Sequence, residues 1–173
     1  MTENKINNEA VKSYFTKLQT DIINAVEIVD GKNFLVDSWQ RAEGGGGTTC
    51  ILENGNIFER AGIGFSHVVG SQLPKSATDA HPEITDSNWE ATGVSLVFHP
   101  KNPYIPTVHM NVRFFVAKKN NKNVWWFGGG MDLTPYYGFD EDAIHFHKTI
   151  QTALNPFGED LYPEFKKNCD KYF

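Results

Sequence analysis

The 173-residue sequence has little cysteine, no excess of positive charge and no long apolar run, and each absence excludes a class of protein. Its two cysteines, Cys50 and Cys169, form no spaced motif, so we expect reduced thiols in an intracellular protein rather than a disulfide framework. The formal net charge of −5 provides no basic surface for nucleic acid. No apolar run approaches the ~20 residues that cross a bilayer, and the polar N-terminus has no signal-peptide core. These features predict a soluble, cytoplasmic protein without a membrane span.

Several catalytic motifs are also missing. The glycines at 44–47 are not followed by Gly-Lys-Ser/Thr, and they do not form a dinucleotide fingerprint. There is no serine nucleophile elbow and no Cys–His signature, which argues against a hydrolase. The glycine run is therefore either a mobile linker or a place where the backbone approaches a ligand closely, and the neighbouring Trp39 and Arg41 favour the ligand.

The sequence does contain a series of short strand patterns between amphipathic helices. Helices are predicted at 8–29, with Gly31 as the stop, at 140–154, and from about Pro163 onward. Strands are predicted at 34–41, 48–52, 56–59, 65–69, 94–99, 108–116 and 124–127, with a hairpin at Asn54-Gly55, a surface loop at 71–89 and a strand end at Gly128. We therefore predict one α+β domain over residues 1–173, with a large, fairly flat antiparallel sheet covered by helices on both faces.

The stretch 93–113 forms the candidate site because polar side chains alternate there along two strands. Since successive strand residues point to opposite faces, Ser95, Val97 and His99 share a face of the first strand. On the second strand one face carries His109, Asn111, Arg113 and Phe115. The opposite faces are wholly apolar. A buried polar group without a partner is costly, so this polar face predicts a binding or catalytic site.

The residues leave the chemistry of this site open. His99, His109 and His147 could hold a divalent transition metal, with His147 on the apolar stripe of its helix and His145 facing solvent. The same histidines could instead be structural or could transfer protons. Arg113 needs a partner, which is either Asp132 or a ligand carboxylate. Two further histidines, His67 and His81, are interpreted as surface or structural side chains.

Five motifs in one order resemble a known family. They are Trp-Gln-Arg at 39–41 before the glycine run, Gly-Val-Ser-Leu-Val-Phe-His-Pro at 93–100, His-Met-Asn-Val-Arg-Phe-Phe at 109–115, Trp-Trp-Phe-Gly-Gly-Gly-Met-Asp-Leu-Thr-Pro at 125–135 and Pro-Phe-Gly-Glu-Asp at 156–160. Together they resemble the oxygen-dependent coproporphyrinogen III oxidases of the aerobic bacterial type. The resemblance covers essentially the whole chain.

The resemblance implies an oxidoreductase of haem (porphyrin) biosynthesis. Such enzymes oxidatively decarboxylate two propionates of coproporphyrinogen III to vinyl groups, giving protoporphyrinogen IX. Oxygen is the co-substrate, and carbon dioxide and hydrogen peroxide are released. No organic cofactor is implied, a divalent metal cation is associated with bacterial members, and the enzyme is a homodimer.

The resemblance also implies roles for individual residues. Ser95 resembles a substrate contact, and the segment of Asn111, Val112 and Arg113 resembles the part that holds the substrate. The implied metal ligands are His99, His109 and His147, and His109 is also a proton donor. Asp132 and Arg41 are expected to meet pyrrole nitrogens or propionates.

Family members continue beyond the position of Phe173, so we expect the chain to be the N-terminal part of a longer domain. The implied later parts are a further histidine ligand, a Gly-Gly-Arg substrate segment and the dimerisation region. We therefore expect little activity from this chain alone, together with self-association. Two other functions stay open: a tetrapyrrole-binding chain without catalysis, and an unrelated metal-dependent oxygenase that acts on small organic acids.

Overall fold

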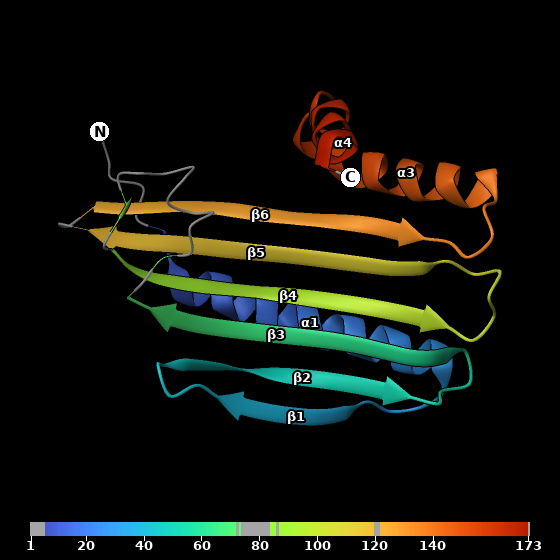
Figure 1. Cartoon of the computed structure of the whole chain (residues 1–173), viewed down its shortest axis with the longest axis horizontal. Coiled ribbons are helices and arrows are strands. Elements are labelled where there is room, and N and C mark those ends of the chain that lie inside the picture. The colour runs from blue at the N-terminus through green and yellow to red at the C-terminus, as the bar shows by residue number, and fades with distance from the viewer. Residues whose placement is uncertain (1–5, 72, 74–83, 86, 120–121, 173) are drawn as a thin grey trace.

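A six-stranded antiparallel sheet, with its strands in chain order from β1 to β6, forms the centre of the computed structural model (Figure 1). The structure describes residues 6–71, 73, 84–85, 87–119 and 122–172. The strands are β1 (Leu35–Gln40), β2 (Gly45–Glu53), β3 (Phe58–Gly70), β4 (Asn88–Pro100), β5 (Thr107–Lys119) and β6 (Lys122–Thr134). The helices are α1 (Asn8–Asp30), α3 (Asp140–Leu154) and α4 (Leu161–Tyr172), with the 3-10 turn η2 (Asn155–Phe157) between the last two. The predicted α+β fold and its antiparallel sheet are confirmed.

Strands β2 to β6 are longer than their sequence patterns predict, and glycine does not interrupt β2, β3, β4 or β6. Gly45 to Gly47 pair with β3 inside β2, so the linker interpretation of this run is wrong. Likewise β6 continues through Gly128 to Gly130, which pair with Arg113 to Asn111 on β5. The predicted strand end at Gly128 is therefore wrong. A glycine run signals a break in an isolated segment, but here neighbouring strands supply its hydrogen bonds, β1 and β3 for the run in β2 and β5 for the run in β6.

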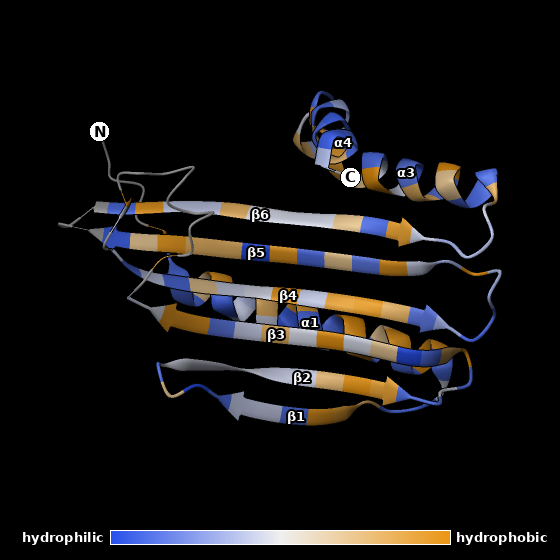
Figure 2. Ribbon diagram, viewed as in Figure 1, coloured by the Kyte–Doolittle hydropathy of each residue, from blue (hydrophilic) through white to orange (hydrophobic). Residues whose placement is uncertain are grey.

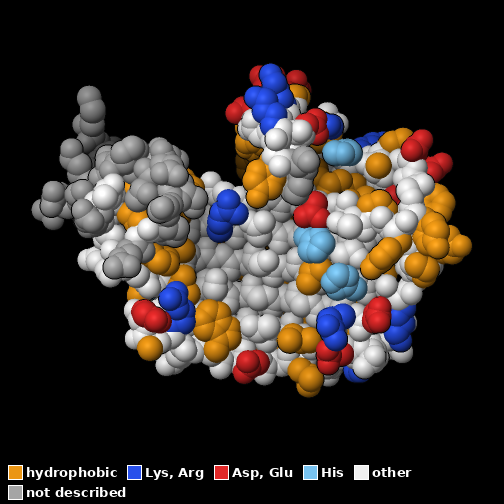
Figure 3. Space-filling view, viewed as in Figure 1, with side chains coloured by type: hydrophobic (Ala, Val, Ile, Leu, Met, Phe, Trp, Pro, Cys, Tyr) orange, Lys and Arg blue, Asp and Glu red, His pale blue; other side chains and the backbone are white. Residues whose placement is uncertain are grey.

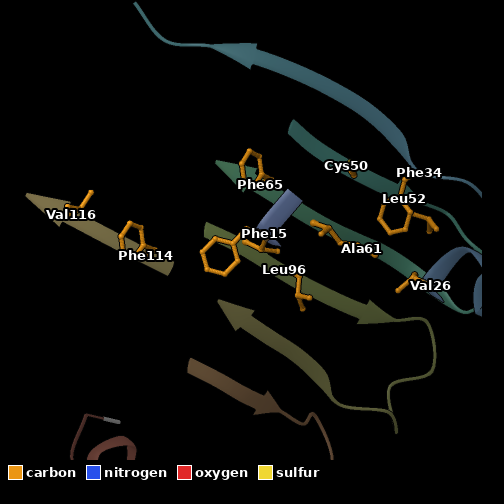
Figure 4. Packing of buried hydrophobic residues seen from close by; sticks show 12 residues of the cluster. Phe15, Val26, Phe34, Cys50, Leu52, Ala61, Phe65, Leu96, Phe114 and Val116 are labelled. Carbon is orange, nitrogen blue, oxygen red and sulfur yellow. The ribbon is translucent and has the colours of Figure 1, made fainter. Parts of the chain in front are cut away.

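Helix α1 covers one face of the sheet, and the hydrophobic core lies between them. Its N-terminus is capped by the Asn7 side chain, which accepts the Ala10 N–H at 3.1 Å, and it ends at Gly31 in the left-handed conformation, as predicted. Figure 2 shows hydrophobic and hydrophilic residues alternating along the helix, and Figure 4 shows how the core side chains meet between α1 and the strands. The buried cluster comprises Phe15, Val26, Phe34, Cys50, Leu52, Ala61, Ile63, Phe65, Val94, Leu96, Phe114 and Val116.

The end of α1 is tied to the turn between β2 and β3. The buried carboxylate of Asp30, 2% exposed, accepts the backbone N–H groups of Asn56, Ile57 and Phe58, each at 2.9 Å. Burial alone would raise the pKa of this carboxyl, but these three hydrogen bonds lower it below its ordinary value of 3.8. The predicted Asn54-Gly55 hairpin is confirmed, with Asn54 at a φ of 52°.

The opposite face of the sheet, which we call the open face, faces the viewer in Figures 1 and 3. Helices α3 and α4 lie beyond the β6 edge instead of across this face (Figure 1), and neither helix has a buried residue. In the part of the chain that the structure describes, helical cover is therefore found on one face, not on the expected two. None of the described helices is long and apolar enough to span a membrane.

Candidate active site

A histidine–aspartate pair lies on the open face near the start of β5 and the end of β6. His109 and Asp132 are direct cross-strand partners, and His109 Nδ1 lies 2.7 Å from Asp132 Oδ1. The same carboxylate oxygen accepts the Thr134 hydroxyl at 3.3 Å. The two side chains of the pair are 43% and 39% exposed, so a ligand can reach both. A carboxylate bonded to Nδ1 orients the imidazole and leaves Nε2 for proton exchange.

His99 lies beside this pair, as strand alternation predicts. The rings of His99 and His109 have centroids 6.3 Å apart and meet edge to face at 85°. The His99 Nδ1 lies 3.3 Å from the hydroxyl of the buried Thr107. Sequence reasoning missed Thr107, although it directly precedes the predicted strand at 108–116.

A second polar group lies farther along the same strands. Ser95 pairs with Asn111 across β4 and β5, and the Arg113 guanidinium Nη1 donates to the Asn111 Oδ1 at 2.6 Å. Of the two partners expected for Arg113, Asp132 is not the one found in the described residues, because Arg113 bonds to Asn111 and the Asp132 carboxylate accepts from His109. The guanidinium lies over Gly128, whose missing side chain makes room for it. Its partner among the described residues is an amide, so its positive charge is available to an anionic ligand.

His147 is not brought to the other two histidines. On α3 its ring packs against Tyr162 of α4, with centroids 6.2 Å apart, and it is half-buried while His145 is exposed. The predicted apolar-stripe position is confirmed, although the stripe faces α4 and not the sheet. No group of three or more histidine, cysteine, aspartate or glutamate side chains in the described residues could hold a metal ion. The predicted three-histidine metal set is therefore not assembled here.

Two other predicted substrate contacts lie away from the open-face groups. The Val112 side chain packs against the core under α1, because it alternates with Asn111 and Arg113. Arg41 follows β1, four strands from β5, which corresponds to about 19 Å at the spacing of neighbouring strands. There it pairs with Glu43 at 3.6 Å and lines a shallow hollow with Trp89.

His67 is structural, as interpreted from the sequence, and His81 lies outside the described residues. The His67 ring bonds to Glu90 at 2.9 Å on the face that α1 covers. Glu90 also accepts from Asn8 at the start of α1 and from Lys118. Burial alone would raise the pKa of Glu90, but the bonds from His67, Lys118 and Asn8 lower it below its ordinary value. These hydrogen bonds join the start of α1 to β3, β4 and β5.

The glycines of β3 are the part of the open face that sequence reasoning missed. Gly62 and Gly64 alternate with Ala61, Ile63 and Phe65, so the open face of this strand is bare at these two positions while its core face is apolar. Glycine at two consecutive period-two positions was the available signal. It was overlooked because the predicted strand began only at Phe65.

A family model described as coproporphyrinogen III oxidase matches residues 10–173 of the chain.

Proposed function

Because the chain belongs to the coproporphyrinogen III oxidase family, we propose that it carries out the oxygen-dependent decarboxylation of coproporphyrinogen III in porphyrin biosynthesis. For each propionate, the C–C bond to the carboxylate breaks, CO₂ leaves, and the adjacent methylene loses the equivalent of a hydride. The hydride equivalent and one further proton reduce O₂ to H₂O₂, and a vinyl group remains. Each turnover of a propionate thus consumes one O₂ and one proton.

One observation supports this substrate above all others: the His109–Asp132 pair and the Arg113 guanidinium lie on the same face of β5, four residues apart. At the rise of a strand this separation is about 13 Å. A macrocycle with carboxylates around its rim can reach both groups at once, whereas a small organic acid cannot. The separation therefore favours a tetrapyrrole over the small-acid oxygenase alternative.

His109 is the residue that would supply the proton. Its Nδ1 is engaged by the Asp132 carboxylate, which holds the ring in one orientation. Proton transfer then takes place at Nε2, toward the oxygen being reduced. A positioned acid of this kind contributes about 10²- to 10⁴-fold to a rate.

Arg113 would hold a propionate that is not reacting. A planar guanidinium can donate two parallel hydrogen bonds to a carboxylate, and the Asn111 amide fixes its orientation through the 2.6 Å bond. Ser95, directly opposite Asn111 and exposed, provides a hydroxyl between the two charged ends of the site.

A divalent metal and a homodimer stay predictions that rest on the resemblance. The described residues do not fit a three-histidine metal site, since His147 packs against Tyr162 away from His99 and His109. No step of the proposed chemistry is assigned to a metal.

The decisive experiment is turnover of coproporphyrinogen III in air and under nitrogen, with the product and H₂O₂ both measured. We expect product and H₂O₂ to form in air and neither to form under nitrogen, so that whatever turnover this chain has depends on O₂. His109→Asn and Asp132→Asn should each lower kcat by about 10²-fold or more, because each removes one half of the proton-transfer pair. His145→Asn is the matched control, since His145 lies on the exposed side of α3. Binding of the tetrapyrrole without turnover would contradict the proposed activity and support the non-catalytic binding function.

A further inference from the structure

Glycine is concentrated on the open face of the sheet, where it occupies positions on four of the six strands, β2, β3, β4 and β6. The register places Gly47, Gly62, Gly64, Gly70, Gly93, Gly128 and Gly130 on this face. Figure 3 looks onto it: the middle is pale, formed by backbone and small polar side chains, and two adjacent histidines and an acidic side chain stand at one side. Glycine inside a strand is destabilising, so each position calls for a physical reason.

Three of these glycines make room for a large side chain of the protein itself. The Trp39 indole lies across Gly47, and the Trp89 indole lies across Gly70. The third is Gly128, where a Cβ would lie 3.3 Å from Nε of Arg113. The packing of the fold accounts for glycine at these positions.

Two more meet neighbours: a Cβ on Gly93 would lie 2.5 Å from the Val112 carbonyl oxygen, and a Cβ on Gly62 would touch the Val97 side chain at 3.7 Å. Gly64 and Gly130 are different, because no side chain of the described protein fills the space above them. A Cβ on Gly64 would lie 3.9 Å from its nearest neighbour, the Ser95 carbonyl oxygen, and a Cβ on Gly130 would have no atom within 4 Å. Neither residue has a positive φ, so an L-residue can adopt its backbone conformation. Alanine would fit the fold at both positions, and the fold therefore gives no reason for glycine.

The two open glycines lie in one row across the sheet, at either end of the polar pair already described. Gly64 pairs with Ser95, Ser95 with Asn111, and Asn111 with Gly130. The row spans β3 to β6, which is three strand spacings or about 14 Å. It runs between the His109 and Arg113 positions on β5. A bare backbone on both sides of an exposed hydroxyl and amide is a surface that a disc-shaped ligand can cover with its whole face.

We propose that Gly64 and Gly130 determine ligand specificity by keeping the floor of the site bare, so that a tetrapyrrole lies with its ring face against the sheet. This inference rests on the proposed function and adds to it the orientation of the macrocycle. Ser95 and Asn111 then lie under the centre of the ring, within reach of its pyrrole N–H groups. A methyl group at either glycine lifts one side of the ring from the sheet and removes its dispersion contacts.

The test combines thermal stability with tetrapyrrole binding in Gly64→Ala and Gly130→Ala. Coproporphyrin III, the unreactive oxidised macrocycle, is the fluorescent probe, titrated with each purified protein. We expect a melting temperature equal to or above that of the unsubstituted protein. The added methyl group meets no close atom, and alanine loses less conformational entropy on folding than glycine does. Affinity should fall by about tenfold in each variant, since one side of the ring face loses contact.

Two matched glycines serve as controls. Gly138→Ala introduces a methyl at another position with no atom within 4 Å, but in the connection between β6 and α3, and should leave affinity unchanged. Gly47→Ala would collide with the Trp39 indole and should lower the melting temperature. Unchanged affinity in both Gly64→Ala and Gly130→Ala, with the unsubstituted protein binding the probe, would overturn the inference while leaving the proposed function intact. If the unsubstituted protein binds neither coproporphyrin III nor coproporphyrinogen III, the proposed function and the inference both fail.

Discussion

Replacing Arg113 with lysine tests the proposed site at its anion-binding end. The guanidinium donates one hydrogen bond to the Asn111 Oδ1 at 2.6 Å and lies over Gly128. Its remaining N–H groups form a planar fork that matches a carboxylate. Lysine keeps the positive charge but cannot hold the Asn111 amide and bind a carboxylate through two parallel bonds at the same time.

The magnitude follows from the one bond that lysine cannot replace. A hydrogen bond between charged groups contributes about 1.5 to 3 kcal/mol. Because the Arg113 side chain is exposed, solvent screening favours the lower end of this range. A loss of about 1.5 kcal/mol corresponds to roughly tenfold weaker binding. The fold should be unaffected, since the side chain makes no core contact.

The assay is a fluorescence titration with coproporphyrin III and with its tetramethyl ester, which has the same ring but no carboxylates. Arg113→Lys should weaken binding of the acid by about tenfold and leave binding of the ester unchanged. Lys17→Arg is the control, since Lys17 is an exposed cation on α1, on the opposite side of the sheet, and should change neither affinity. Equal affinities of the unsubstituted and Arg113→Lys proteins for the acid would remove Arg113 from the site.

Two further predictions concern stability. Asp30→Ala leaves three backbone N–H groups without their acceptor and should cost about 3 kcal/mol or more in urea unfolding, whereas Asp30→Asn keeps one acceptor oxygen and should cost less. Because folding lowers the pKa of Asp30, the ionised carboxylate stabilises the fold fully above its ordinary pKa of 3.8, and this stabilisation is lost as the pH falls below that value. The Asp30→Asn variant should therefore lose less stability on acidification. An identical dependence of unfolding free energy on pH in both proteins would contradict this role of Asp30. His147→Ala should lower the stability by about 1 kcal/mol through the lost contact with Tyr162, while His145→Ala should change it by less than about 0.5 kcal/mol, and equal effects in thermal unfolding would refute this difference between the helix faces.

The polar face of β4 and β5 could be predicted because strand alternation is a local property. Period two along each segment is enough to place Ser95 with His99, and His109 with Asn111 and Arg113. The pairing of the two strands followed from the short proline-rich connection between them. The structure confirms this face, with Ser95 opposite Asn111 and the two histidine rings 6.3 Å apart.

The partner of Asp132 could not be predicted, because it depends on pairing between strands. With the strand at 124–127 expected to end at Gly128, Asp132 fell in a loop and Arg113 was its nearest plausible partner. Once β6 continues to Thr134, the register places Asp132 directly opposite His109. The true end of β6 therefore assigns the Asp132 carboxylate to His109 and not to Arg113. No single-segment pattern contains this information, since register is set by both strands together.

The glycines show why a single sequence cannot separate packing from function. Gly129 and Gly130 are neighbours in the chain, yet they face opposite sides of the sheet. A Cβ on Gly129 would meet the backbone carbonyl of Asn111, so glycine there is required by the fold. A Cβ on Gly130 would meet nothing within 4 Å, so packing of the described residues does not require glycine there. The two cases look the same in sequence, because the difference lies in the atoms that the register brings to each face. For this reason the alanine variant at Gly130, stable but weakened in binding, distinguishes a bare binding surface from a packing constraint.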